Sequence, residues 1–320
     1  LSLHDALPIY PDICKFLAIF LVTWSHSAQC VSGEIWTNIF GGKQLDISFN
    51  MPLFMMISGW FLNIDKMRKT KVFDFAVSKF KRLMIPAFTW YFLYLILSLK
   101  LPEVTMLCFY WYLTALFLCL CTILLFSKLF KSNTLCCLLS IALILLLPKT
   151  DYANMNFMFP FIWAGYGLRQ LFATKKATPF VIICAIIGLC LCFGWDRSYT
   201  VYLAPFQILH TNREMLFAYI YRFAIGFTLS AVCIFLIKKY EQQLQTLAPL
   251  GTYSLVIYTS SMVLLKCVSK ILDYFQFHTN TYVLIDVLSL GLCTLIVCLI
   301  ILFSFFCRRH KVIKMLFLGE

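Results

Sequence analysis

Long, continuous apolar segments are the feature that most constrains what this 320-residue chain can fold into. Ten such runs occur, at about 12–30, 46–63, 83–101, 107–126, 135–148, 156–173, 179–194, 215–237, 252–272 and 282–306. Most approach the ~20 residues that an α-helix needs to cross the hydrocarbon core of a bilayer. Barrel strands would instead alternate in polarity over about ten residues. The sequence therefore predicts an all-α, polytopic integral membrane bundle of about ten transmembrane helices.

Composition and charge support this prediction. The chain is 62% hydrophobic and 13% charged, whereas a soluble domain is roughly half apolar and a quarter charged. A formal charge of +13 would suggest nucleic acid in a soluble protein, but these cations cluster between apolar runs. Eighteen Lys and Arg residues lie in every second loop and the C-terminal segment, against five in the opposite set. The positive-inside rule then places both termini in the cytoplasm and makes nucleic acid an unexpected partner.

The chain divides into one large unit and two short ends. Residues 1–9 start with Leu1 and do not fit the pattern of the rest, so we expect them to be non-native or disordered. Residues 10–306 form the expected transmembrane domain, and residues 307–320 a basic cytoplasmic tail. Fifteen cysteines lie mostly within apolar runs, with neither a Cys-x-x-Cys pair nor zinc-ligand spacing. We therefore expect small hydrophobic side chains rather than a metal site.

Ionisable groups inside a span are costly, so those of the first run are functional candidates. Asp12 and Lys15 are three residues apart, hence neighbours on one helical face. They either serve a catalytic site or simply pair at the inner interface. His26 lies eleven residues beyond Lys15 on the same face, roughly 16 Å deeper in the bilayer. Its imidazole could accept a proton from an attacking hydroxyl or become acylated; the alternative is a hydrogen bond to a neighbouring helix.

Further candidates follow the first run. Asn50 and Ser58 in the second run are polar groups that need partners. The basic segment after it carries Arg68, Lys69, Lys81 and Arg82, which could bind the phosphates of a nucleotide-like donor or anchor anionic membrane lipid. Trp195 and Tyr199 belong to the longest extracytoplasmic segment and suit either a sugar or an interfacial aromatic belt. We expect Tyr110, Trp111 and Tyr112 to form such a girdle at the outer interface.

Several motifs in this order resemble the type-3 membrane acyltransferases. A basic residue, ten intervening positions and a histidine match that family's first-helix motif, here Lys15 to His26. The other matching stretches are Met51-Pro52-Leu53-Phe54 with Ser58-Gly59, Arg82 with Pro86, Trp111-Tyr112-Leu113, Gly165-Tyr166-Gly167-Leu168, and residues 250–258. The resemblance covers residues 10–306. Two positions depart from the family pattern, because Asn50 replaces a common histidine and Thr259-Ser260-Ser261 stand where another often follows.

The resemblance implies a membrane-bound O-acyltransferase of the cytoplasmic (inner or plasma) membrane of a bacterium. Its donor substrate would be cytosolic acyl-CoA, most often acetyl-CoA, and its acceptor a hydroxyl of an extracytoplasmic or lipid-linked carbohydrate. His26 would act as base or acyl relay, with Lys15 and Asp12 in the catalytic group. Arg68, Lys69, Lys81 and Arg82 would contact the donor, Asn50 and Ser58 the developing oxyanion, and Trp195 and Tyr199 the sugar. A transporter or flippase for a lipid-linked sugar or small solute, and a non-catalytic scaffold, remain alternatives.

Overall fold

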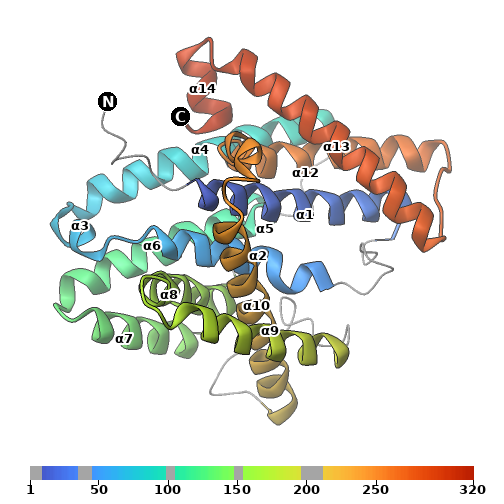
Figure 1. Cartoon of the computed structure of the whole chain (residues 1–320). Coiled ribbons are helices and arrows are strands. Elements are labelled where there is room, and N and C mark those ends of the chain that lie inside the picture. Colours follow the sequence, from blue (N-terminus) through green and yellow to red (C-terminus); the bar gives the residue numbers. More distant parts are fainter. Residues whose placement is uncertain (1–8, 35–44, 99–104, 148–153, 196–211) are drawn as a thin grey trace.

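The computed structural model describes residues 9–34, 45–98, 105–147, 154–195 and 212–320, and in this part of the chain every regular element is a helix (Figure 1). Side chains are described for all of these except residues 45–48. The helices are α1 (Tyr10–Ser32), α2 (Leu45–Trp60), α3 (Ile64–Lys69), α4 (Val72–Ser98), α5 (Met106–Phe109), α6 (Trp111–Leu129), α7 (Asn133–Leu146), α8 (Met155–Leu171), α9 (Ala177–Phe193), α10 (Arg213–Lys239), the 3₁₀ turn η3 (Gln245–Leu247), α11 (Ala248–Gly251), α12 (Ser254–Tyr274), α13 (Tyr282–Cys307) and α14 (Lys311–Leu318). The all-α prediction is confirmed for these residues.

Each of the ten expected apolar runs coincides with a helix. Among the described residues, five helices are long and apolar enough to cross a membrane, namely α4, α6, α10, α12 and α13, and α7 and α9 are shorter apolar helices. Large apolar side chains project outward from them, including Leu138, Ile186, Leu189, Val287 and Leu302. Such a surface suits lipid rather than water. The protein is a multi-pass membrane protein; the count of ten spans and the cytoplasmic side of the termini stay predictions.

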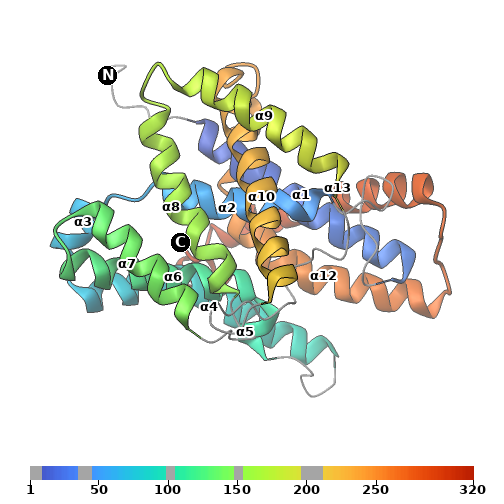
Figure 2. The ribbon, with the colours of Figure 1, turned by 90° about the horizontal axis from the view of Figure 1, so that it is seen from below.

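Helix α1 lies at the centre of the bundle, and α2, α10, α12 and α13 pack around it (Figures 1 and 2). Small residues allow the closest approaches. A Cβ atom added to Gly251 would lie 1.9 Å from the Asp12 carbonyl oxygen, so the α11 backbone contacts the start of α1 directly. Gly59 of α2 and Gly165 of α8 make a reciprocal contact of the same kind. Membrane helices use small residues in this way because backbone proximity, not apolar burial, drives their packing.

Two segments differ from the sequence-based expectation. The basic segment 64–82, expected as a loop, is almost wholly helical, because the Asn63 side chain caps α3 and α4 already begins at Val72. Hydropathy finds spans but not helices that carry many cations, although Lys and Arg are good helix formers. The expected run 107–126 is interrupted at Tyr110, which separates the single-turn helix α5 from α6. Interior proline residues occur in α2, α4 and α8, at Pro52, Pro86 and Pro160.

Candidate functional site

A cavity of about 910 Å³ lies between the beginning of α1, the end of α2, the α3–α4 segment, α6 and the α11–α12 region. Four cationic residues line it, Lys15, Lys66, Lys79 and Arg82. Three acidic residues, Asp12, Asp74 and Glu320, are also in its wall. Its opposite end is lined by apolar and aromatic side chains from α2, α6 and α12. The cavity thus has a charged mouth on the predicted cytosolic side and an apolar interior, which suits a ligand with an anionic head and an apolar tail.

The Asp12–Lys15 pair forms one edge of the mouth. Lys15 Nζ lies 2.8 Å from Asp12 Oδ1, and the ammonium group lies 5.1 Å above the ring of Phe61. Both charged side chains keep about a third of their surface exposed. Close contact with Gly251 fixes the backbone of Asp12. The ion pair considered from the spacing is therefore present, and it borders the cavity, where a catalytic or donor-binding role remains a prediction.

The predicted donor contacts separate into two groups. Arg82 lines the cavity and is exposed to it. In the described part of the chain, Arg68, Lys69 and Lys81 do not line it, and Lys69 and Lys81 are exposed elsewhere on the surface. Lys66 and Lys79, which were not among the predicted donor contacts, line the cavity together with Arg82 instead. Helical periodicity within 64–82 would have been the signal, had this segment been read as helices.

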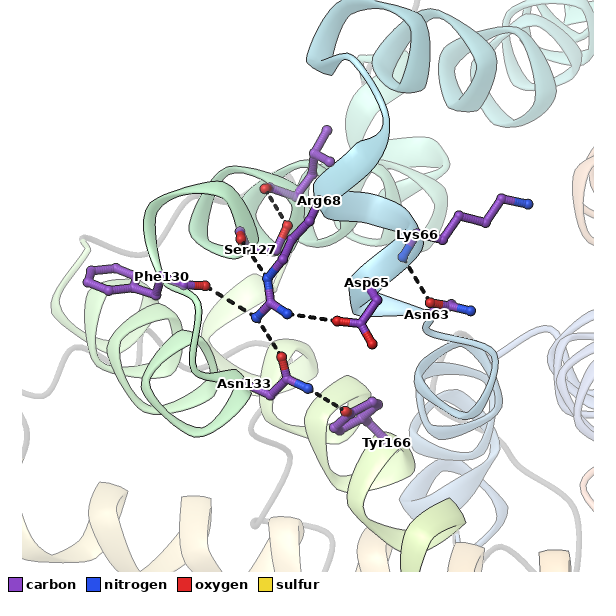
Figure 3. A network of polar contacts seen from close by, with 9 residues as sticks. Asn63, Asp65, Lys66, Arg68, Ser127, Phe130, Asn133 and Tyr166 are labelled. Atoms are coloured by element: carbon purple, nitrogen blue, oxygen red, sulfur yellow. Dashed lines mark hydrogen bonds and ion pairs between the residues drawn. The ribbon is translucent and has the colours of Figure 1, made fainter.

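Arg68 is engaged by the protein itself (Figure 3). Its Nη1 lies 2.8 Å from Asp65 Oδ1, Nε donates to the Ser127 carbonyl at 3.0 Å, and Nη2 donates to Asn133 Oδ1 at 2.6 Å and to the Phe130 carbonyl at 3.2 Å. Asn133 in turn donates to the Tyr166 hydroxyl of α8. This network ties α3 to the α6–α7 connection and to α8. All three guanidinium nitrogens of Arg68 thus contact protein groups, whereas Arg82 lines the cavity.

Aromatic rings close the inner end of the cavity. Phe54, Tyr112 and Tyr258 line it, with ring centroids 5.6 Å apart for Phe54–Tyr112 and 5.7 Å for Tyr112–Tyr258. Behind them Tyr110 is fully buried and donates from its hydroxyl to the Thr259 carbonyl at 2.6 Å. The expected outer girdle is therefore wrong for Tyr110 and Tyr112, because the break at Tyr110 turns these rings into the bundle. We call Phe54, Tyr112 and Tyr258 the aromatic floor.

His26 lies beyond the aromatic floor. It is half-buried, and its Nδ1 is 3.0 Å from Oε1 of Gln29, one turn further along α1. Contacts of Asp12 with Gly251 and of Cys30 with the Leu265 carbonyl show that α1 and α12 run in the same direction. Counted at the helical rise from these two contacts, His26 is roughly 5–10 Å further from the predicted cytosolic end than Tyr258. Within the described residues His26 does not line the cavity, so the cavity does not extend to the imidazole.

Gln29 was missed by sequence reasoning, although its spacing of three residues from His26 could have indicated it. An amide oxygen at this distance accepts a hydrogen bond, which requires the hydrogen of a neutral imidazole to be on Nδ1. The Nε2 lone pair is then available to take up a proton. The Gln29 contact favours the Nδ1-protonated tautomer, an arrangement that suits a general base.

The remaining candidates have mainly local partners. Ser58 lines the cavity, donates to the Phe54 carbonyl at 2.9 Å and lies beside the Tyr112 hydroxyl. Asn50 is buried, and its Oδ1 accepts from the Met51 amide at 2.6 Å. Trp195, the predicted sugar contact, stacks its ring with Tyr221. The guanidinium group of the buried Arg222 lies 4.6 Å from the centre of the Trp195 ring.

Tyr199 lies outside the described residues. Among the described residues, no group of three or more His, Cys, Asp or Glu side chains is placed to hold a metal ion.

Comparison with known proteins identifies the family. A family model described as an acyltransferase domain matches residues 9–304, which is nearly the whole helical bundle. No curated protein and no solved structure matches the chain significantly. The matched range includes the Lys15–His26 motif, the aromatic floor and most of the cavity wall. The chain therefore belongs to the acyltransferase 3 family of membrane acyltransferases.

Proposed function

We propose that this acyltransferase moves an acyl group, most often acetyl, from cytosolic acyl-CoA to a hydroxyl of an extracytoplasmic or lipid-linked carbohydrate. The observation that carries the proposal is the order of groups along one path. A cationic mouth with Lys15, Lys66, Lys79 and Arg82 leads into an apolar cavity. By the helical rise, His26 lies roughly one to two turns beyond the floor of that cavity. A bacterial cytoplasmic membrane is the expected setting.

The donor binds with its phosphates at the mouth. Lysine ammonium groups and an arginine fork both neutralise phosphate charge, and the fork adds two directed hydrogen bonds. The cavity of about 910 Å³ is large enough for a drug-sized ligand or part of a larger one. Its apolar walls receive the pantetheine arm and bring the thioester to Ser58 and the aromatic floor.

The chemical step joins the two sides of the floor. The acceptor hydroxyl gives its proton to Nε2 of His26 as its oxygen attacks the thioester carbon. The carbon–sulfur bond then breaks, and the leaving thiolate takes the proton back from the imidazolium, which restores the neutral base. In the relay version His26 itself accepts the acyl group and passes it to the hydroxyl. Both versions require the acyl group to pass Tyr112 and Tyr258, and Ser58 to steady the oxyanion. Gln29 keeps the imidazole in the required tautomer.

The test uses inverted vesicles supplied with labelled acetyl-CoA and counts label on glycan. His26→Ala should lower transfer about 10²–10⁴-fold, the usual contribution of a positioned acid–base group, while the binding of CoA at the mouth is retained. His278→Ala is the matched control, because His278 pairs with Asp273 at the far end of α12. Unchanged labelling with His26→Ala would remove the proposed mechanism. Solute uptake without any acyl donor would favour the transporter that the sequence alone left open.

A further inference from the structure

The C-terminal helix α14 folds back onto α4 and brings its end to the cavity (Figure 1). The Trp90 indole donates to the Phe317 carbonyl at 3.3 Å, and the Phe317 ring meets Trp90 edge-on at 5.3 Å. Leu318 is buried, and Gly319 adopts a left-handed φ of 70° against the Arg82 carbonyl. Only glycine adopts this conformation at so close an approach without strain. These contacts anchor α14 through its apolar face and place Glu320 in the cavity wall.

The Glu320 carboxylate is held by two cations, Arg308 and Lys314, neither of which belongs to the predicted donor contacts. Arg308 Nη2 lies 2.9 Å from Oε1, and Lys314 Nζ lies 3.2 Å from Oε2. Partial burial acts to raise the pKa of Glu320, but the hydrogen bonds and charges of Arg308 and Lys314 outweigh it and lower the pKa below its ordinary value. All three side chains keep about a third of their surface exposed, so this contact is open to solutes at the mouth.

Arg308 has a second support that does not depend on Glu320. Its Nη1 donates to the Tyr253 hydroxyl at 2.9 Å, and the guanidinium lies 4.5 Å above the Tyr253 ring. A cation placed over an aromatic face is attracted by its quadrupole and retains this orientation. The arginine fork would therefore stay in position if the carboxylate left.

We propose that Arg308 and Lys314 form an anion clamp that binds a phosphate of the donor, and that Glu320 is its internal competitor. Carboxylate and phosphate both present oxygens that an arginine fork recognises, and phosphate carries more charge. Because α14 is anchored by Trp90 and Phe317, the Glu320 side chain can leave the clamp without displacing the helix. Assigning the phosphate to the acyl donor rests on the proposed function; the clamp itself does not.

Glu320 occupies the clamp in part of the molecules. The apparent affinity of the clamp for phosphate is therefore reduced in proportion to the fraction of molecules in which the clamp is vacant. The test measures binding of pyrophosphate and of CoA, separately, to the full-length protein in detergent at ~0.1 M salt. Glu320→Gln should bind both probes about three- to ten-fold more tightly. Arg308→Gln should weaken both. The double variant should show no tightening from the loss of Glu320, because the clamp itself is gone.

Asp273→Asn is the matched control, since it also converts an acid to its amide but lies at the other end of α12. It should leave both affinities unchanged. Equal affinities for wild type and Glu320→Gln, or tightening that persists without Arg308, would overturn the clamp. If pyrophosphate follows the expected order but CoA does not bind, the clamp stands and the proposed donor is wrong. If CoA binds but neither probe responds to these substitutions, the donor proposal survives and the clamp fails.

Discussion

Gly165→Ala should destabilise the bundle at the crossing of α2 and α8. A Cβ atom at Gly165 would lie 1.9 Å from the Met56 carbonyl oxygen, about 1 Å inside the 3.0 Å limit that real Cβ contacts respect. The opposing atom belongs to a helix backbone and cannot rotate away. The reciprocal contact of Gly59 with the Ile162 carbonyl, at 1.8 Å, prevents the two helices from pivoting to make room. Overpacking of this kind costs about 1–3 kcal/mol.

Gly167→Ala is the matched control on the same helix. Nothing lies within 4 Å of the Cβ atom it would add. Both variants share the gain of up to ~1 kcal/mol that alanine has over glycine in a helix, so that gain cancels in the comparison. Gly165→Ala should therefore be less stable than Gly167→Ala by about 1–3 kcal/mol. Equilibrium unfolding in mild detergent, followed by tryptophan fluorescence, measures this difference.

The same change should reach the cavity, because Ser58 directly precedes Gly59 on α2. Separation of α2 from α8 would shift Ser58 relative to the aromatic floor, so the folded fraction of Gly165→Ala should also lose transfer activity, while Gly167→Ala keeps it. Equal stability of the two alanine variants would refute the direct backbone contact and with it this account of how α2 is positioned.

Two further predictions concern charged side chains. Arg68→Lys keeps the charge but loses the guanidinium fork, so it should lower the free energy of unfolding by about 1–3 kcal/mol and leave the affinity for CoA unchanged. The control Lys69→Ala, at an exposed position, should change the free energy of unfolding by less than ~0.5 kcal/mol. A loss of CoA affinity without a loss of stability in Arg68→Lys would restore Arg68 as a donor contact. Because the pKa of Glu320 is depressed below its ordinary value of 4.5, its ion pairs with Arg308 and Lys314 should stabilise the protein fully above that value and stop doing so as pH falls through the depressed pKa. The stability difference between wild type and Glu320→Gln, followed in denaturant titrations from pH 7 to 3, should shrink on acidification, and a difference independent of pH would contradict the ion pairs.

Local pattern alone predicted the helical class and helical structure at each long apolar run, but not the break at Tyr110 within the run 107–126. It predicted the Asp12–Lys15 pair as well, because residues three apart on a helix are neighbours whatever surrounds them. The order of short motifs from Lys15 to Tyr258 led to the family that the comparison then showed. These features depend only on the spacing of residues along the chain, which can be read from the sequence without knowing the tertiary structure.

Tertiary structure decided which of the many cations serve the cavity. Arg68 and Arg82 look alike in sequence, yet Arg68 is bound by the Ser127 and Phe130 carbonyls at the end of α6, and Arg82 lines the mouth. The inward turn of Tyr112, and the return of α14 that brings Glu320 to the cavity, likewise depend on partners more than a hundred residues away. A charge or a ring acts only on groups within a few ångströms, so its role is set by neighbours that folding brings together.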